Sequence, residues 1–198
     1  RINMKKVLWL DVETTGLDCR KHGLREVGFI IEIDGVEVDK GVFKINPFTY
    51  TTKDVEIDDY ALEISKVSIE DLESYDRASY CFKELMKKLV KYVNVNDKND
   101  CFVIAGYNTA FDIGFIKEWF KEMGLLDSYK DLFHYKSLDV FSIVFALRHI
   151  GLNSAENDKL ETMCNYFGIG IEAHNALSDI EATKKLYELI CEKFILKA

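Results

Sequence analysis

The chain carries a short apolar run that ends in two acids, and this run strongly limits how the chain can fold. Val7-Leu8-Trp9-Leu10 is followed directly by Asp11-Val12-Glu13. Such a run is typical of a strand buried on both faces, as in a sheet covered by helices. Residues two apart in a strand project from the same face, so Asp11 and Glu13 point together. We therefore predict a buried first strand whose end presents two carboxylates.

The remaining elements indicate an α/β domain. Residues 26–33 and 36–45 are rich in Val, Ile and Phe, and Asp34-Gly35 between them predicts a hairpin with a primed turn. Residues 101–105 and 134–138 predict two more strands. Apolar spacing predicts helices at 78–93, 110–123, 140–149, 159–167 and 176–194, and the polar stretch 94–100 predicts a surface loop. This order predicts a five-stranded mixed sheet flanked by helices.

The length of the chain and the lack of repeats or low-complexity tracts favour a single domain that covers residues 1–198. The chain has 198 residues, one proline (Pro47), no internal repeat and no low-complexity tract. Met4 is expected to be the natural start, with Arg1, Ile2 and Asn3 added before it. No basic region followed by an apolar stretch marks a secretory signal, and no apolar run approaches the ~20 residues that span a bilayer.

The cysteines indicate a reducing compartment. There are five, an odd number, and no pair has C-x-x-C spacing; they are Cys19, Cys81, Cys101, Cys164 and Cys191. A disulfide framework or a structural zinc site is therefore not expected. We predict a cytoplasmic protein without a membrane segment.

The formal net charge of −8 argues against a general DNA-coating protein, which would carry a basic face. It leaves room for an enzyme that grips a few nucleotides at one end. Part of the negative charge can belong to a metal site, where bound cations offset it.

Three further segments place an acid at the start of a helix. Asp112 and Asp179 each have an alternative as an ordinary helix-cap residue, with Thr109 or Asn175 as the capping partner. Asp139 is expected to be structural. For Asp11 and Glu13 the alternative is an acidic strand end that faces solvent.

The combination favours a metal site over four unrelated acids. Asp11 and Glu13 end one strand, Asp112 follows the neighbouring strand, and Asp179 begins a helix that can pack beside them. Sites in α/β domains form at the carboxyl ends of strands. Four carboxylates there can hold two Mg²⁺ or Mn²⁺ ions about 3.5–4 Å apart, an arrangement suited to displacement at phosphorus. The nearby His174 can remove a proton from water.

Three motifs together resemble those of the DEDDh (DnaQ-like) 3′–5′ exonuclease family. They are Asp11-x-Glu13-Thr-Thr-Gly-Leu17, Asn108-x-x-Phe111-Asp112 and His174-x-x-x-x-Asp179. The general likeness is greatest to the exonuclease domain of the DNA polymerase III epsilon subunit. The resemblance implies a ribonuclease H-like fold and two Mg²⁺ or Mn²⁺ ions. A histidine, where another branch has tyrosine, marks the DEDDh branch.

The resemblance also implies a role for each residue. Asp11 would bridge both metals, Glu13 and Asp179 would complete the first metal's shell, Asp112 would support the second, and His174 would be the general base. Thr14, Thr15 and Leu17 would hold the terminal nucleotide, with Asn108 and Phe111 beside it. For the threonines, a plain turn after a strand is the alternative. Tyr107 and Glu63-Ile64-Ser65 depart from the family's usual residues, which leaves substrate preference open.

The expected activity is hydrolysis of phosphodiester bonds from a 3′ end, releasing nucleoside 5′-monophosphates. Single-stranded DNA is the favoured substrate. The alternatives are an RNA-directed enzyme similar to oligoribonuclease, and a catalytically silent module that binds nucleic-acid ends or a polymerase. Nucleic acid 3′ ends are the expected partner and a DNA polymerase is a second one that the resemblance implies; the oligomeric state stays open.

Overall fold

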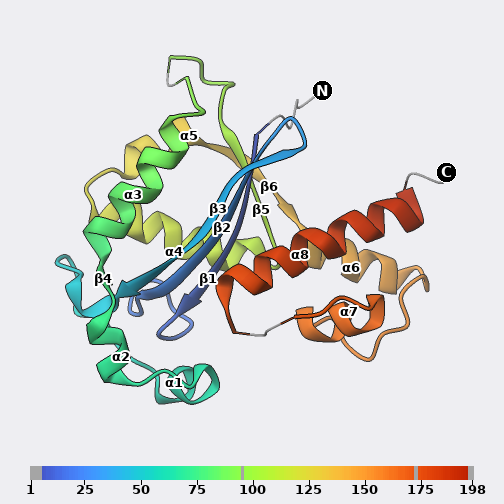
Figure 1. Cartoon of the computed structure of the whole chain (residues 1–198), viewed down its shortest axis with the longest axis horizontal. Helices are drawn as coiled ribbons and strands as arrows, with labels where there is room; N and C mark the ends of the chain where they lie inside the picture. Colours follow the sequence, from blue (N-terminus) through green and yellow to red (C-terminus); the bar gives the residue numbers. More distant parts are fainter. Residues whose placement is uncertain (1–5, 95, 172–173, 196–198) are drawn as a thin grey trace.

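Strand β1 (Lys6–Thr14) lies inside a sheet whose strand order is β4-β3-β2-β1-β5-β6. The computed structural model describes residues 6–94, 96–171 and 174–195, so the expectation about Arg1, Ile2, Asn3 and Met4 lies outside the described residues. β1 pairs antiparallel with β2 (Leu24–Ile33) and parallel with β5 (Phe102–Gly106). Beyond β5, β6 (Phe133–Asp139) is also parallel. The α/β class and the mixed sheet are thus confirmed (Figure 1).

The sheet has six strands, so the prediction of five was wrong. The sixth, β4 (Asp76–Arg77), has two residues and pairs in parallel with the end of β3 (Val36–Asn46). Two residues carry no readable periodicity, so only the tertiary structure reveals this strand. The β2–β3 hairpin is as predicted: Asp34 and Gly35 have φ values of 51° and 81°, as a primed turn requires.

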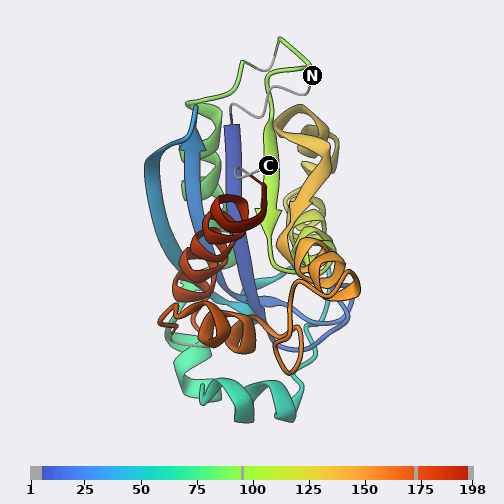
Figure 2. The same ribbon diagram turned by 90° about the vertical axis from the view of Figure 1, so that its right-hand side faces the viewer.

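β1 separates two hydrophobic cores, which explains its unbroken apolar run. Leu8 and Leu10 face the core beneath α3 (Ala78–Val90) and α4 (Thr109–Glu122). Val7 and Trp9 face the core beneath α6 (Val140–His149), α7 (Leu160–Phe167) and α8 (Ala176–Ile190). The two helical layers lie on opposite faces of the sheet (Figures 1 and 2). The first strand is therefore buried on both sides, as predicted.

Several short elements connect these layers. They are α1 (Asp59–Ser65), α2 (Ile69–Ser74), α5 (Tyr129–Leu132), the 3₁₀ turns η1 (Pro47–Thr49) and η2 (Leu126–Ser128), and a π-helical turn η3 (Cys191–Ile195) that follows α8. The sequence analysis missed α2, although Ser68 and Asp71 form a capping box at its start.

Two of the long helices are shorter than predicted: α3 ends three residues before its predicted limit, and α8 ends four residues before its own. Among the described residues, no helix combines the length and apolar character needed to cross a membrane.

Candidate active site

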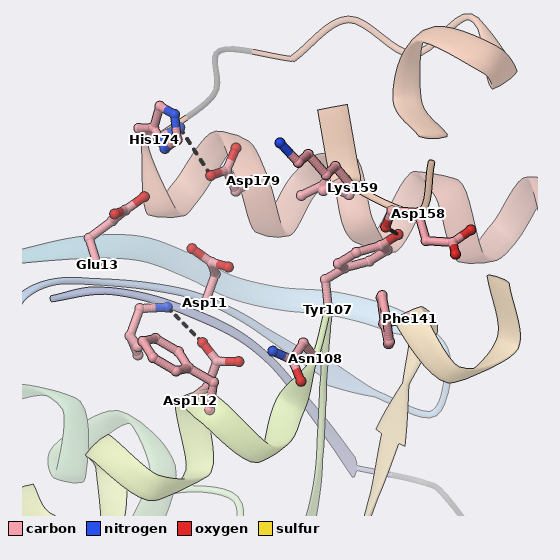
Figure 3. A pocket seen from close by; sticks show the side chains of 13 residues that line it. Asp11, Glu13, Tyr107, Asn108, Asp112, Phe141, Asp158, Lys159, His174 and Asp179 are labelled. Atoms are coloured by element: carbon pink, nitrogen blue, oxygen red, sulfur yellow. Dashed lines mark hydrogen bonds between the residues drawn. The ribbon is translucent and has the colours of Figure 1, made fainter. Parts of the chain in front are cut away.

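An acidic cavity of about 640 Å³ lies at the carboxyl end of the central strands. β1, the start of α4, the segment before α7 and the start of α8 form its walls (Figure 3). The residues that line it are Asp11, Val12, Glu13, Tyr107, Asn108, Phe111, Asp112, Phe141, Asp158, Lys159, Leu160, His174 and Asp179. All five residues predicted to be catalytic are among them.

Three of the predicted metal ligands meet at one point. Carboxylate oxygens of Asp11, Glu13 and Asp179 all lie within 4.8 Å of one another. Asp11 and Glu13 come from the same face of β1, as the two-residue spacing predicted, while Asp179 comes from the first turn of α8. The carboxylate oxygens match the ligand preference of a hard divalent cation.

A glycine lets α8 approach the sheet closely enough for this. Gly28 of β2 is paired with Asp11 across the sheet, and a Cβ atom there would lie 2.4 Å from the backbone of Ala176. The buried Glu26 then accepts a hydrogen bond of 2.9 Å from the backbone N–H of Ala176. The sequence analysis missed both residues. An acid and a glycine two residues apart in a largely apolar strand were the available signal.

Asp112 lies apart from the group of three. It is 3% exposed, and its Oδ1 accepts a hydrogen bond of 3.0 Å from the backbone N–H of Val12 in β1. The alternative capping box with Thr109 is wrong, because α4 has Asn108 at its N-cap and no side-chain capping bond. Asp112 instead ties α4 to the strand that carries Asp11 and Glu13.

Asp139 has the structural role expected of it. Its Oδ1 accepts hydrogen bonds from the N–H of Asn108 at 2.8 Å and from the N–H of Phe141 at 3.2 Å. It therefore caps α6 and fixes the turn between β5 and α4. This turn holds Asn108 in the left-handed region, with φ of 64°.

An arginine that the sequence analysis missed is bound to Glu13. Arg25 Nη2 lies 2.7 Å from Glu13 Oε2, and the Arg25 side chain is 4% exposed. No spacing rule connects a residue of β2 to one of β1, so this contact only became visible in the folded chain. The pair fixes one side of the Glu13 carboxylate.

The acids are held in an environment that disfavours their charge. Burial, together with the neighbouring carboxylates, raises the pKa of Asp11 well above its usual range. Burial and Glu13 raise the pKa of Asp179 to about 7. Burial also raises the pKa of Asp112, while for Glu13 the same effect is opposed by Arg25.

The residues present fit a divalent cation. Asp179 Oδ1 is buried and has no hydrogen-bond partner among the described residues. A carboxylate oxygen without a partner, beside two more carboxylates, is costly to bury unless a cation neutralises it. Asp11, Glu13 and Asp179 could hold one ion, and Asp112 stands on the other side of Asp11 (Figure 3).

His174 lies at the mouth of the cavity, over Glu13 and Asp179 (Figure 3). Its backbone is left-handed, with φ of 67°, and its N–H donates to Asp179 Oδ2 at 3.2 Å. Asn175 caps α8 through Ser178, as the capping alternative proposed. The cap and the inward-facing Asp179 coexist in one helix start, so the two interpretations of this segment did not compete. The His174 ring is exposed to solvent.

The residues predicted to bind substrate divide into two groups. Asn108 and Phe111 line the acidic cavity, whereas Thr14 and Leu17 line an adjoining cavity of about 240 Å³ that shares Glu13 and Phe111 with it. Leu17 is 82% exposed, so its apolar side chain is open to solvent beside this cavity. Tyr60 and Ile64 of α1 line the same cavity; Ile64 belongs to the segment that the resemblance connects with substrate preference, whereas Tyr60 was not singled out.

Thr15 does not reach either cavity. It is fully buried, its hydroxyl donates to the Glu56 carbonyl at 2.8 Å, and its Oγ1 accepts from Gly23 N at 3.0 Å. Its own N–H also donates to the Gly23 carbonyl. These bonds fix the turn after β1, and a direct contact of Thr15 with a nucleotide stays a prediction.

Comparison with known proteins connects this site to a family. A family model described as exonuclease matches residues 8–187. Ribonuclease T of Shewanella frigidimarina (strain NCIMB 400) is 29% identical over 196 residues, which cover 93% of this chain and 81% of that protein.

Solved structures share the fold. E. coli exonuclease I in complex with a dT13 oligonucleotide has a TM-score of 0.74 at 19% identity, over 94% of this chain and 41% of that one. Its complex with a dA16 oligonucleotide has a TM-score of 0.75 at 20% identity, over 96% and 41%. The chain thus spans about two fifths of these exonuclease I chains. The ribonuclease H-like fold is confirmed, while the special likeness to the epsilon-type domain stays a prediction.

Proposed function

The chain belongs to the exonuclease family, and we propose that it removes nucleotides one at a time from the 3′ end of nucleic acid. The observation that carries the proposal is the meeting of Asp11, Glu13 and Asp179 within 4.8 Å, with one Asp179 oxygen left without a partner. Purely structural acids would be paired or would face solvent. We propose that residues 1–198 act as one exonuclease domain.

The acids would hold two Mg²⁺ or Mn²⁺ ions, with Asp11, Glu13 and Asp179 at the first and Asp11 and Asp112 at the second. When bound, two such ions activate water and stabilise the leaving 3′ oxygen. His174, exposed at the mouth beside Glu13, would accept the proton of the attacking water. The product is a nucleoside 5′-monophosphate.

The terminal nucleotide would occupy the adjoining cavity. Leu17 and Phe111 offer apolar surface to its base, and Thr14 lines the same cavity together with Glu13. Base stacking on apolar and aromatic side chains tolerates any sequence, which suits an enzyme that removes every nucleotide in turn. The arrangement therefore supports a single-stranded end.

Single-stranded DNA is the substrate we propose, with RNA as the alternative. Exonuclease I, which shares the fold, has been crystallised with oligodeoxynucleotides, and the relative found by sequence is a ribonuclease. A silent binding module is less well supported, because it has no need to retain like charges in one cavity. A polymerase partner and a cytoplasmic location stay predictions.

One assay tests polarity, sugar and metal together. Single-stranded DNA and RNA of the same sequence, labelled at the 5′ or the 3′ end, are incubated with Mg²⁺, Mn²⁺ or EDTA. We expect a descending ladder from the 5′-labelled strand, immediate release of mononucleotide from the 3′-labelled strand, and no reaction in EDTA. A ladder from the opposite end, or cleavage in EDTA, would refute the proposal.

A further inference from the structure

The acidic cavity contains one lysine, and the mechanism proposed above makes no use of it. Lys159 directly precedes α7, and in the described chain it is the only Lys or Arg that lines the cavity. Its amino end points back toward Asp179, on the side of the cavity away from Glu13 (Figure 3). A cation so close to five acids needs an explanation.

The backbone that carries Lys159 is held firmly in place. The Tyr107 hydroxyl donates to the Asp158 carbonyl, and Arg148 Nε lies 2.6 Å from Asp158 Oδ1. The N–H of Lys159 donates to Asn157 Oδ1 at 2.9 Å. Tyr107, which replaces the residue usual in the resembling family, thus fixes this segment against the end of β5. The backbone of Lys159 is therefore anchored, although its side chain is exposed.

The ammonium group itself is left available. Within residues 6–94, 96–171 and 174–195, Lys159 takes part in no ion pair. Lys184, by comparison, lies 2.9 Å from Glu32. The preceding residue, Asp158, is already paired with Arg148. An anchored lysine with a free ammonium is suited to bind an anion that enters from solvent.

The net charge of the cavity explains why the positive charge of Lys159 would favour the binding of a phosphate. Of the five acids that line the cavity, Asp158 is paired with Arg148, so four carboxylates remain. The positive charge that Arg25 brings to Glu13 is opposed by the nearby buried Glu26. Two divalent cations would balance these four charges, and the loaded centre would then offer a strand of phosphates no net attraction. Lys159 adds one positive charge beyond that balance.

The order of the subsites along the cavities indicates which phosphate of the strand would lie at Lys159. The adjoining cavity with Leu17 lies beside Glu13, the group of three acids follows, and Lys159 lies beyond them. Building on the proposed function, we propose that Lys159 binds the phosphate that precedes the scissile one, on the 5′ side of the penultimate nucleotide. Lys159 would then hold the strand while the terminal bond is cut.

A pair of dinucleotides isolates this contact. Thymidylyl-thymidine has only the scissile phosphate, and its 5′-phosphorylated form adds the preceding one. We expect the wild-type protein to prefer the phosphorylated form by about tenfold in kcat/KM, as for one charged hydrogen bond. Lys159→Gln should lose this preference and cleave the unphosphorylated form at nearly the wild-type rate. Lys159→Arg should keep most of the preference.

A control variant and a binding measurement test this interpretation further. Lys87→Gln, an exposed lysine of α3 paired with Glu84, should behave as wild type on both substrates. In binding of a labelled oligothymidylate with Ca²⁺ in place of Mg²⁺, Lys159→Gln should reduce the slope of log affinity against log salt by about 0.7, the value for one phosphate contact on a single strand.

The remaining outcomes would overturn the inference. If Lys159→Gln slows both dinucleotides equally, the lysine contacts the scissile phosphate and the assigned position is wrong. If the variant matches wild type on both, the lysine binds no phosphate, and the proposed function still stands. If the wild-type protein cleaves neither dinucleotides nor longer strands, the proposed function fails and the inference fails with it.

Discussion

Helices α4 and α8 both open at the acidic cavity, and each brings an aspartate in its first turn, but they begin in different ways. α8 has an ordinary cap, in which Asn175 accepts a hydrogen bond from Ser178 N at 3.0 Å. α4 has no side-chain cap, and its N-cap Asn108 is held in the left-handed region by Asp139.

The two aspartates differ accordingly. The Asp112 carboxylate is used to tie α4 to the backbone of β1. The Asp179 carboxylate accepts from His174 N through one oxygen and leaves the other without a partner among the described residues. In α8 the side chain of Asn175 caps the helix, so Asp179 keeps one carboxylate oxygen available for a ligand. In α4 the Asp112 carboxylate binds the backbone of β1, so it both holds the helix in place and adds negative charge to the site.

The strongest expected difference is in activity. Asp179→Ala should abolish exonuclease activity, a loss of at least about 10³-fold, because the group of three acids loses its only member from α8. Release of labelled mononucleotide measures this, and unchanged circular dichroism shows that the fold persists. Near-wild-type release would show that Asp179 is not needed at the metal site.

Replacing His174 should lower the rate of cleavage but have little effect on metal binding. His174→Ala is expected to lower kcat by about 10²–10⁴-fold, as for loss of a general base. The thermal stabilisation by Mn²⁺ should remain, since His174 contributes only its backbone to Asp179. An unchanged rate would remove His174 from the reaction, and lost Mn²⁺ stabilisation would make it a ligand.

Stability should separate the two aspartates when metal is absent. Asp112→Ala leaves the Val12 N–H without an acceptor, so it should be less stable than Asp112→Asn by about 1–3 kcal/mol. Asp179→Ala removes a carboxylate with an unpartnered oxygen and should be at least as stable as wild type. Urea unfolding in EDTA measures all three variants. Equal stability of the two Asp112 variants would show that the bond to Val12 contributes little.

The pKa of Asp179 predicts how metal stabilisation depends on pH. Its folded value of about 7, against an ordinary 3.8, means that the folded protein holds a proton the unfolded chain releases between these values. Without metal, stability should therefore fall as pH rises through this window. Mg²⁺ displaces that proton, so the rise in Tm that Mg²⁺ causes should be larger at about pH 8 than at about pH 5.5. An equal rise at both pH values would contradict this, and Asp179→Asn should flatten the dependence.

The smallest effects should come from the two N-cap asparagines. Asn175→Ala should cost about 1 kcal/mol of unfolding free energy, and Asn175→Gly only a few tenths. Asn108→Gly should stay close to wild type, because its φ of 64° suits glycine and its side chain makes no cap bond. Urea unfolding checks both. A large cost at Asn108 would reveal a structural role for its amide.

Much of this protein follows from local pattern. The apolar run before Asp11 required a strand covered on both faces, because only two cores can accommodate side chains from both sides of it. Asp34-Gly35 determined the hairpin turn through its positive φ values. The two-residue spacing of Asp11 and Glu13 placed both carboxylates on one face, since the strand period is two.

The tertiary structure decided which residues from elsewhere meet them. Asp179 reaches Asp11 because Gly28 has no Cβ to hold α8 away. Asp112 binds Val12 rather than its own helix, and Arg25 pairs with Glu13 across two strands. Contacts between residues far apart in the chain have no sequence period, and they exist only once packing has brought the surfaces together. The sequence by itself supplied the acids, and the packing of α4 and α8 on the sheet made them one site.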